Sequence, residues 1–351
     1  MPTISCTLPT NFPSKLPLNL PRLVPTNTNT PHLYNYGSFS TSRKSTLNVK
    51  LDNFQDPLQI NDYDKFSLVV VHADNNELSQ KRYAYDEYVV SQNFLVRLYE
   101  LDIYQKASLE ALLKYTEETG LNLFQSSGLV VEGHYAVSEE MLSLNLTWVI
   151  GRMQVEVNSY PSWGDIVQVE SWCSAIGKHS VTCSSRLTNF KTGKKIMRVD
   201  SEFAMINKNT RRISKILEEI KAKGQPYIRE NFDPITINDK LRKLRKLDVN
   251  EADISITGIR PMWFDLDPNQ HVNNVKYISW ILEGIPETVR ENCELAALTV
   301  EYRRECGREN VLQSLSTAST KNSLEFDHLL CMENSKEVAR ARTLWRSSTS
   351  E

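Results

Sequence analysis

This sequence of 351 residues lacks two features that would point to common protein classes. No apolar run approaches the ~18–20 residues that a transmembrane helix needs, and the best candidate, residues 66–72, is far too short. The six cysteines form no Cys-x-x-Cys pair and have no histidine at zinc-ligand spacing. The sequence therefore predicts a soluble protein without a zinc module.

Acidic residues are absent from residues 1–51, which hold five basic residues and seven of the fourteen prolines among many Ser, Thr and Asn. A segment of this composition cannot bury a core. It has no continuous apolar stretch like that of a secretory signal, and an acid-poor, hydroxyl-rich, basic leader is typical of an organellar transit peptide. We therefore predict that residues 1–51 are a transit peptide, with a disordered tail as the alternative.

The rest of the chain is acidic, with 36 Lys and Arg against 43 Asp and Glu, a net charge of −7. Domains that bind nucleic acids are usually basic, so general nucleic-acid binding is not expected. Residues 52–88 are charged and irregular, and we interpret them as a variable leader or linker ahead of the first folded domain.

From about residue 89 the chain alternates between strand and helix patterns, in the same order twice. In each pass one strand precedes one amphipathic helix, and four strands rich in β-branched and aromatic residues follow. In the first pass we expect a strand at 94–100, a helix from Ser108 to Gly120, and strands at 146–157, 166–175, 180–190 and 196–206. In the second we expect a strand at 254–260, a helix at 274–285, and strands at 296–304, 310–319, 323–332 and 337–345.

This internal repeat predicts an α+β protein in which each half is one long helix wrapped by a curved antiparallel sheet, the hotdog arrangement. A tandem, or double, hotdog would have its N-terminal domain at residues 89–208 and its C-terminal domain at 251–351. Between them, residues 209–250 are basic and helical or irregular, and we interpret them as a linker.

A polar, turn-prone stretch before the second helix is the strongest candidate for a functional site. It is rich in Asp, Pro and Asn, which favour turns, and Asn273 or Asn274 is suited to cap the helix that follows. The free N–H groups of a helix N-terminus would thus face a loop that carries Asp267, Asn269 and His271. That arrangement suits a developing oxyanion.

The three side chains of this loop have different chemical roles open to them. His271 is suited to proton transfer because an imidazole titrates near neutral pH. Asn269 would orient that imidazole or hydrogen-bond the substrate. Asp267 would activate water or fix Asn269, or it would only form an Asx-turn that shapes the loop. The stretch before the first helix, residues 100–106, has neither Asn nor His, so we expect the chemistry in the second half.

Several motifs in this chain resemble the plant acyl-ACP thioesterases. The second half carries Asp-x-Asn-x-His-Val-Asn-Asn-x-x-Tyr-Ile, which begins at Asp267, and Glu-Tyr-Arg-Arg-Glu-Cys, which ends at Cys306. Residues 152–165 and 209–215 are also similar to that family, and the resemblance runs from about residue 90 to the C-terminus. The run at 304–315 is closer to the FatB class, which favours saturated acyl chains, than to the FatA class.

The resemblance implies a thioester hydrolase of the plastid stroma that releases free fatty acid from saturated acyl-ACP and so ends chain elongation. It implies no metal or organic cofactor, because water is the second substrate. It also implies that the first hotdog forms the acyl pocket, that a homodimer is compatible with the family, and that the site residues are Asp267, Asn269, His271, Glu305 and Cys306.

The adjacent Glu305 and Cys306 leave two mechanisms open. In one, Cys306 is a nucleophile that His271 deprotonates, and an acyl-enzyme forms. In the other, Glu305 or Asp267 acts with His271 to activate water and Cys306 only lines the site; we favour this one. Because neighbouring residues of a regular strand point to opposite faces, both side chains would face the pocket only with a bulge, which Gly307 would help to form.

Acyl carrier proteins are acidic, so a thioesterase of net negative charge would meet one through a local basic patch. Solvated linker charges are the alternative interpretation of the same residues. Two rival functions share the fold: a hotdog acyl-CoA thioesterase or hydro-lyase, and a non-catalytic acyl-carrier-binding protein with a degenerate site. The candidates for the basic patch are Arg211, Arg212, Lys215, Arg242, Arg245 and Lys246.

Overall fold

A computed structural model of the chain describes residues 88–127, 130–131, 133–229, 235, 244–319 and 324–348. The chain divides into two units, 1–69 and 70–351, and every described residue belongs to the second. The predicted transit peptide, the predicted leader up to residue 87, and Arg242 lie outside the described residues. Among the helices in these ranges, none is long and apolar enough to span a membrane.

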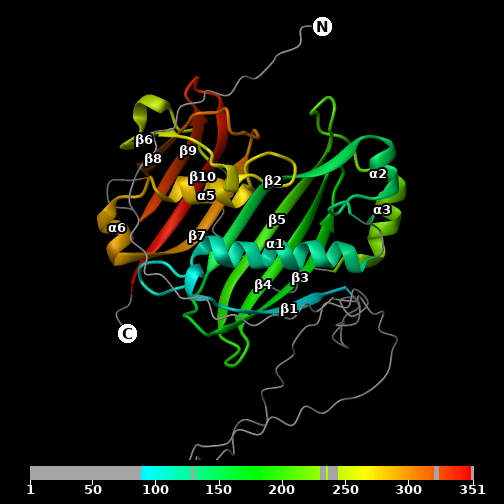
Figure 1. Cartoon of the computed structure of the whole chain (residues 1–351), viewed down its shortest axis with the longest axis horizontal. Helices are drawn as coiled ribbons and strands as arrows, with labels where there is room; N and C mark the ends of the chain where they lie inside the picture. Colours follow the sequence, from blue (N-terminus) through cyan, green and yellow to red (C-terminus); the bar gives the residue numbers. More distant parts are fainter. Residues whose placement is uncertain are drawn as a thin grey trace, which may run out of the picture. The chain divides into compact units, whose positions relative to one another are not determined.

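One continuous sheet of ten strands receives five strands from each pass of the sequence (Figure 1). Its order is β1-β3-β4-β5-β2 from the first half and then β7-β10-β9-β8-β6 from the second. In both halves the first strand lies at an outer edge and the second strand lies at the centre, where β2 and β7 pair antiparallel. The strands are β1 (Val90–Leu95), β2 (Leu146–Val157), β3 (Ile166–Ile176), β4 (Ser180–Asn189), β5 (Lys195–Asn207), β6 (Ile254–Ile259), β7 (Cys293–Tyr302), β8 (Leu312–Ala318), β9 (Glu325–Met332) and β10 (Glu337–Ser347).

One long helix from each half crosses the sheet, α1 (Leu109–Ser126) and α5 (Asn274–Leu282) (Figure 1). α1 packs against β1 and β3, α5 packs against β8 and β9, and the two helices contact each other. Their apolar faces and the inner faces of both halves of the sheet form one core, and burial of each such side chain contributes roughly 1.5–3 kcal/mol. Its members include Leu112, Leu113, Val155, Ile278, Ile281 and Val300. The predicted α+β class with two helix-and-sheet repeats is confirmed.

Short helices connect these elements. They are η1 (Leu98–Glu100), α2 (Glu139–Ser143), α3 (Glu218–Gly224), η2 (Gln225–Tyr227), η3 (Val249–Glu251), η4 (Trp263–Asp265) and α6 (Glu287–Asn292). Most strand predictions agree with the structure to within three residues at each end. The exception is the strand predicted at 94–100: β1 ends at Leu95, and the Glu100 carboxylate turns the chain into η1 by accepting a hydrogen bond from the Arg97 N–H at 2.8 Å.

The C-terminal ends of both long helices were predicted wrongly. Gly120 was expected to end the first helix, but α1 continues to Ser126 because Leu123 in its last turns is buried in a second apolar cluster. That burial outweighs the ~1 kcal/mol that an interior glycine costs a helix. The second helix ends earlier than expected, at Leu282, and Pro286 then caps the separate helix α6.

The first part of the segment interpreted as a linker packs against the first half. Ile213 forms a β-bridge with Ile206, and Ile228 forms one with Cys173. Ile216 is buried in the cluster that also holds Cys173. Residues just after β5 are therefore held on the sheet, and this fixes the direction in which their side chains point.

Candidate active site

A polar pocket of about 390 Å³ opens beside the loop that leads into α5. Two segments line it. The first is the loop itself, and the second is the stretch that follows β7. The lining residues are Asn269, Gln270, His271, Glu305, Cys306, Gly307, Glu309 and Asn310. Four of the five predicted site residues thus meet in one pocket. Its polar walls suit the polar groups of a ligand better than an alkyl chain.

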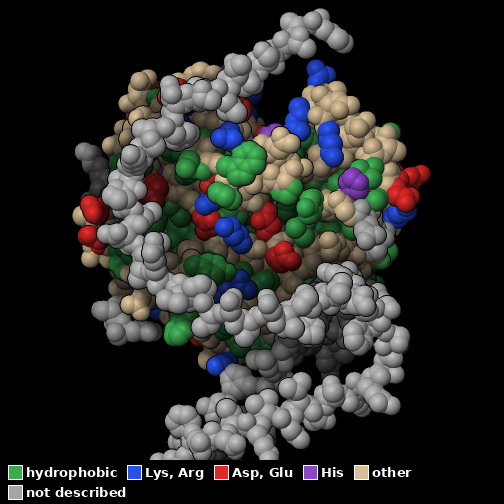
Figure 2. Space-filling model, in the orientation of Figure 1, with side chains coloured by type: hydrophobic (Ala, Val, Ile, Leu, Met, Phe, Trp, Pro, Cys, Tyr) green, Lys and Arg blue, Asp and Glu red, His purple; other side chains and the backbone are tan. Residues whose placement is uncertain are grey.

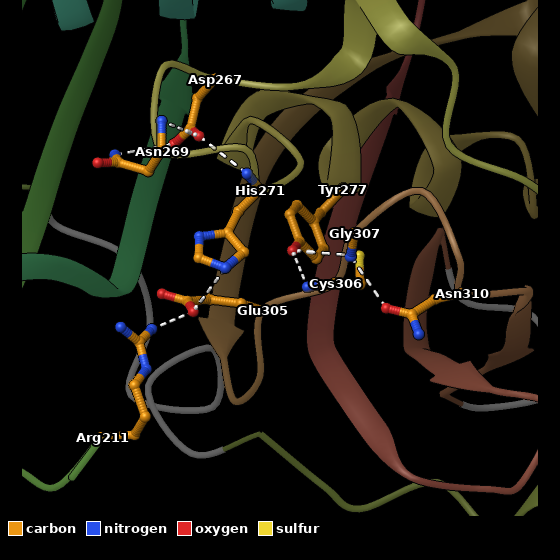
Figure 3. A network of polar contacts seen from close by, with 9 residues as sticks. All are labelled: Arg211, Asp267, Asn269, His271, Tyr277, Glu305, Cys306, Gly307 and Asn310. Atoms are coloured by element: carbon orange, nitrogen blue, oxygen red, sulfur yellow. Dashed lines mark hydrogen bonds and ion pairs between the residues drawn. The ribbon is translucent and has the colours of Figure 1, made fainter. Parts of the chain in front are cut away.

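The fifth predicted residue, Asp267, does not line the pocket but holds its loop together (Figure 3). One carboxylate oxygen accepts hydrogen bonds from the N–H groups of Asn269 at 2.9 Å and His271 at 3.1 Å. The other accepts from the Asn269 side-chain amide at 3.3 Å. Gln270, between them, has a positive φ of 65°. Asp267 therefore forms the Asx-turn that was the alternative interpretation of this residue.

The helix cap lies where the sequence predicted it. The Asn273 side chain accepts a hydrogen bond from the Val275 N–H at 2.9 Å and caps α5. The side-chain amides of Asn273 and Asn274 also reach the Glu117 carboxylate of α1, at 3.5 and 3.4 Å. The start of α5 is thus held both by its own cap and by the helix of the other half.

His271, Glu305 and Arg211 form a network of charged or titratable side chains (Figure 3). His271 Nε2 lies 3.5 Å from Glu305 Oε2. The same carboxylate oxygen also pairs with the Arg211 guanidinium. The His271 and Glu305 side chains are 41% and 36% exposed, so water reaches both.

Glu305 and Cys306 both line the pocket without a strand bulge, contrary to expectation. β7 ends at Tyr302, and the residues after it are irregular, so the alternation of a strand does not apply to them. The Cys306 carbonyl accepts a hydrogen bond from the Val272 N–H at 3.0 Å, which ties this segment to the helix loop. The Gly307 N–H donates to the Asn310 side chain at 2.9 Å and closes the next turn.

Cys306 is buried against Tyr277 of α5. Its N–H and its thiol both donate to the Tyr277 hydroxyl, at 3.1 and 3.3 Å. Burial raises the pKa of the Cys306 thiol to about 11; the hydrogen bond to Tyr277 opposes this shift, and the carboxylates of Glu309 and Glu305 add to it. The thiol is therefore protonated at neutral pH.

The sequence analysis did not include Tyr277 among the site residues. Its ring is buried, and its hydroxyl reaches the backbone and side chain of Cys306. A buried phenol usually needs a hydrogen-bond partner, and that rule was the available signal. It does not say which residue the partner is.

The loop before α1 has the same backbone structure as the loop before α5. Asp102 accepts from the N–H groups of Tyr104 at 2.9 Å and Lys106 at 3.0 Å, as Asp267 does from its two loop residues. Gln105 has a φ of 60°, like Gln270. Each loop is closed by an isolated β-bridge, Leu101↔Ala107 in one and Leu266↔Val272 in the other.

The pocket-lining segment after β7 also has a counterpart in the first half. The Ala107 N–H donates to the Pro161 carbonyl at 2.8 Å, as Val272 does to Cys306. The Ser162 N–H donates to Asp165 at 2.8 Å, as Gly307 does to Asn310.

The paired residues show which parts of the site are scaffold and which are specific to the second half. Tyr104 and Lys106 stand where the second half has Asn269 and His271, and Tyr160 and Pro161 stand where it has Glu305 and Cys306. The Asx-turn, by contrast, is present in both. The loop without the histidine has an aspartate in the same contacts, so the turn accounts for the hydrogen bonds of Asp267 to its own loop.

Within the described ranges, no group of three or more His, Cys, Asp or Glu side chains is arranged to hold a metal ion. The fold defines a tandem hotdog protein, and its polar pocket lies beside the helix of the second half.

Comparison with known proteins agrees with this class. Residues 87–223 match the acyl-ACP thioesterase N-terminal domain, and residues 249–347 match the C-terminal domain. A palmitoyl-acyl carrier protein thioesterase of Gossypium hirsutum is 48% identical over 269 residues, covering 74% of this chain and 64% of that protein. The acyl-[acyl-carrier-protein] hydrolase FATB2 of Cuphea viscosissima is 41% identical over 268 residues, covering 76% and 64%.

The structure of a 12:0-ACP thioesterase from Umbellularia californica is also similar, with a TM-score of 0.69 and 38% identity over 74% of this chain and 95% of that one. This chain belongs to the acyl-ACP thioesterase family. The resemblance found in the sequence is confirmed, and relatives with FatB names are among the matches. The chain spans about 64% of the length of the curated relatives named above.

Proposed function

We propose that this protein hydrolyses the thioester of saturated acyl-ACP to free fatty acid and the carrier thiol. The observation that carries the proposal is the pairing of His271 Nε2 with Glu305 Oε2, 3.5 Å apart in a water-accessible pocket that Asn269 also lines. Family membership supports the same reaction. Related proteins named as chloroplastic, and the acid-poor leader, support action in the plastid stroma.

The proposed reaction uses water as the nucleophile. His271, oriented by Glu305, takes a proton from water, and the hydroxide attacks the thioester carbonyl carbon. The Asn269 amide has two N–H groups, and one of them donates to Asp267. The other is available to the carbonyl oxygen as it gains negative charge. The C–S bond then breaks, and the imidazolium returns its proton to the leaving thiolate.

In this proposal Cys306 has a supporting role. Its thiol donates to Tyr277, and its raised pKa of about 11 keeps it protonated at neutral pH. A protonated thiol is a weak nucleophile. The contacts of His271 also favour water over Cys306 as the nucleophile, because His271 Nε2 faces Glu305 and the Cys306 thiol donates to Tyr277 instead. Asp267 acts by shaping the loop.

We propose the predicted division of labour between the domains, with the N-terminal hotdog (89–208) forming the acyl pocket, the C-terminal hotdog (251–351) carrying the chemistry, and 209–250 connecting them. The polar lining of the catalytic pocket supports this, because an alkyl chain needs an apolar wall elsewhere. A homodimer stays a prediction.

The first test is release of free fatty acid from a panel of acyl-ACPs that differ in chain length and saturation, with His271→Ala as the control. We expect hydrolysis that is fastest with saturated chains and falls ~10²–10⁴-fold in the variant, the usual contribution of a general base. Tight binding without release by either protein would favour the non-catalytic carrier-binding alternative. Faster release from acyl-CoA than from acyl-ACP would favour the acyl-CoA thioesterase.

A basic surface for the acidic carrier is the finer part of the proposal. Arg212, Lys215 and Lys246 are exposed, and their side chains have no ion-pair partner among the described residues. Arg245 pairs with Glu251 at 2.7 Å, and this reduces its availability to a partner. We retain the first three as carrier contacts and leave Arg211 out of this surface, because it pairs with Glu305.

Reversing charge at this surface should weaken carrier binding selectively. We expect Arg212→Glu with Lys215→Glu to raise KM for acyl-ACP roughly 10-fold and to leave hydrolysis of acyl-pantetheine unchanged, because only the carrier has the acidic surface. Lys194→Glu, in the hairpin between β4 and β5, is the matched control. Equal kinetics on acyl-ACP for all proteins would remove these residues from the carrier contact.

A further inference from the structure

One residue of the pocket network comes from the other half of the protein. Arg211 lies in the loop directly after β5, a strand of the first half, yet its guanidinium pairs with Glu305 after β7 of the second half. Figure 3 shows the side chain reaching toward Glu305 from a segment distinct from both that line the pocket.

The Arg211 backbone is held by a dense set of hydrogen bonds. The Asn207 side chain accepts from the N–H groups of Asn209 at 3.1 Å and Thr210 at 2.9 Å. The Arg211 N–H donates to the Asn207 carbonyl at 2.8 Å, and the Asn207 N–H donates to the Arg212 carbonyl at 3.0 Å. Arg211 itself has a positive φ of 56°, which is uncommon for a residue with a side chain. The loop thus fixes the backbone position from which the Arg211 side chain extends.

Glu305 needs an anchor of this kind. It lies in an irregular segment, its side chain is 36% exposed, and a glutamate has three rotatable bonds whose freedom opposes a single orientation. Arg211 and His271 share its Oε2 atom. Glu309 adds a second carboxylate to the lining of the same pocket.

We propose that Arg211 is a positioning residue: through its pairing with Glu305 it holds that carboxylate against His271, and so the first half completes the site of the second. This inference rests on the proposed function. It replaces the earlier expectation that Arg211 contacts the carrier protein. A guanidinium suits the task because its planar fork fixes a carboxylate in direction as well as in charge.

The test measures kcat and KM of Arg211→Gln on acyl-ACP and on acyl-pantetheine. We expect kcat to fall ~10–100-fold on both substrates, since small misplacements of catalytic groups cost that much, with little change in KM. Arg211→Lys should recover part of the loss, because it restores the charge but not the fork. Arg290→Gln is the matched control, because Arg290 is a partly exposed arginine that pairs with a glutamate, Glu283, at 3.1 Å.

A double-variant cycle separates this role from a structural one. If Arg211 acts through Glu305, Arg211→Gln should cost little further activity in a Glu305→Gln background. An undiminished loss in that background would overturn the proposal, as would a rise in KM confined to acyl-ACP, which would make Arg211 a carrier contact. Normal release by the unaltered protein with a fully active Arg211→Gln would remove only this role. No release by the unaltered protein would remove the proposed function along with it.

Discussion

Glu305→Gln lowers kcat on acyl-ACP by ~10²–10⁴-fold, whereas Cys306→Ala retains turnover within about tenfold of the unaltered protein. This is the expected result if water is the nucleophile. Glutamine keeps the size of Glu305 but neither its charge nor its ability to orient an imidazole that accepts a proton. Alanine at 306 removes a thiol that is buried against Tyr277 and whose pKa of about 11 keeps it protonated. Steady-state release of fatty acid measures both variants.

The opposite pattern would establish the nucleophilic mechanism. A dead Cys306→Ala beside an active Glu305→Gln, or an acyl group trapped on the unaltered protein and found by mass spectrometry after a rapid quench, would contradict water attack. Because Cys306 is packed in the core, the urea unfolding midpoint of each variant should accompany the kinetics. A Cys306→Ala protein that is inactive but also unfolded would then be recognised, and Cys306→Ser, which keeps a donor to Tyr277, would replace it.

Glu110→Gln should destabilise the protein by about 1–3 kcal/mol at neutral pH. Glu110 lies near the start of α1 and joins the two long helices: it accepts from Lys114 at 2.8 Å, from Lys276 at 2.9 Å and from Ser279 at 2.9 Å. Partial burial alone would raise the pKa of its carboxyl, but these three donors lower it to about 2. Against an ordinary value of 4.5, the difference corresponds to at most about 3 kcal/mol. Figure 2 shows acidic and basic side chains side by side over these helices.

The pH dependence gives the same prediction a second readout. A carboxyl whose folded pKa is depressed stabilises the protein above its unfolded value, and the contribution is lost as pH falls from about 4.5 toward about 2. Urea unfolding of the unaltered protein and of Glu110→Gln should therefore differ most at neutral pH and converge near pH 2–3. Glu118→Gln, an exposed position on the same helix, is the control. A gap that did not shrink on acidification would show that the bonds to Lys114 and Lys276 are not the cause.

Elements that depend on local pattern could be predicted from the sequence. The strand β2 and the Asn273 cap coincide with the expectation, because side-chain alternation and capping are set by neighbours along the chain. Where tertiary contacts compete, the pattern was misleading. Gly120 did not end α1, because burial of Leu123 further on offset its cost.

In the site, too, the contacts between residues close in the sequence were predictable and the long-range contacts were not. His271 and Asn269 stand in one motif whose turn chemistry is local, so their proximity could be expected. The link from Arg211 to Glu305 spans 94 positions and depends on how β5 ends relative to β7. Neither periodicity nor motif spacing predicts a contact between residues so far apart in the sequence, and Arg211 was therefore predicted as a carrier contact or a solvated linker charge. Tyr277 was missed for a related reason, because burial predicts a partner for its hydroxyl but does not identify it.

The repeated loop has a consequence for stoichiometry. The sheet is close to symmetric, with two helices, two Asx-turns and two closing turns, yet Tyr104 and Lys106 occupy the positions that Asn269 and His271 occupy in the other copy. The folded chain therefore joins two units of similar backbone but different loop side chains, as a heterodimer of two such units would, within one polypeptide. On the proposed function we expect each polypeptide to serve one acyl carrier at a time, because the described residues offer no second loop with the asparagine and the histidine.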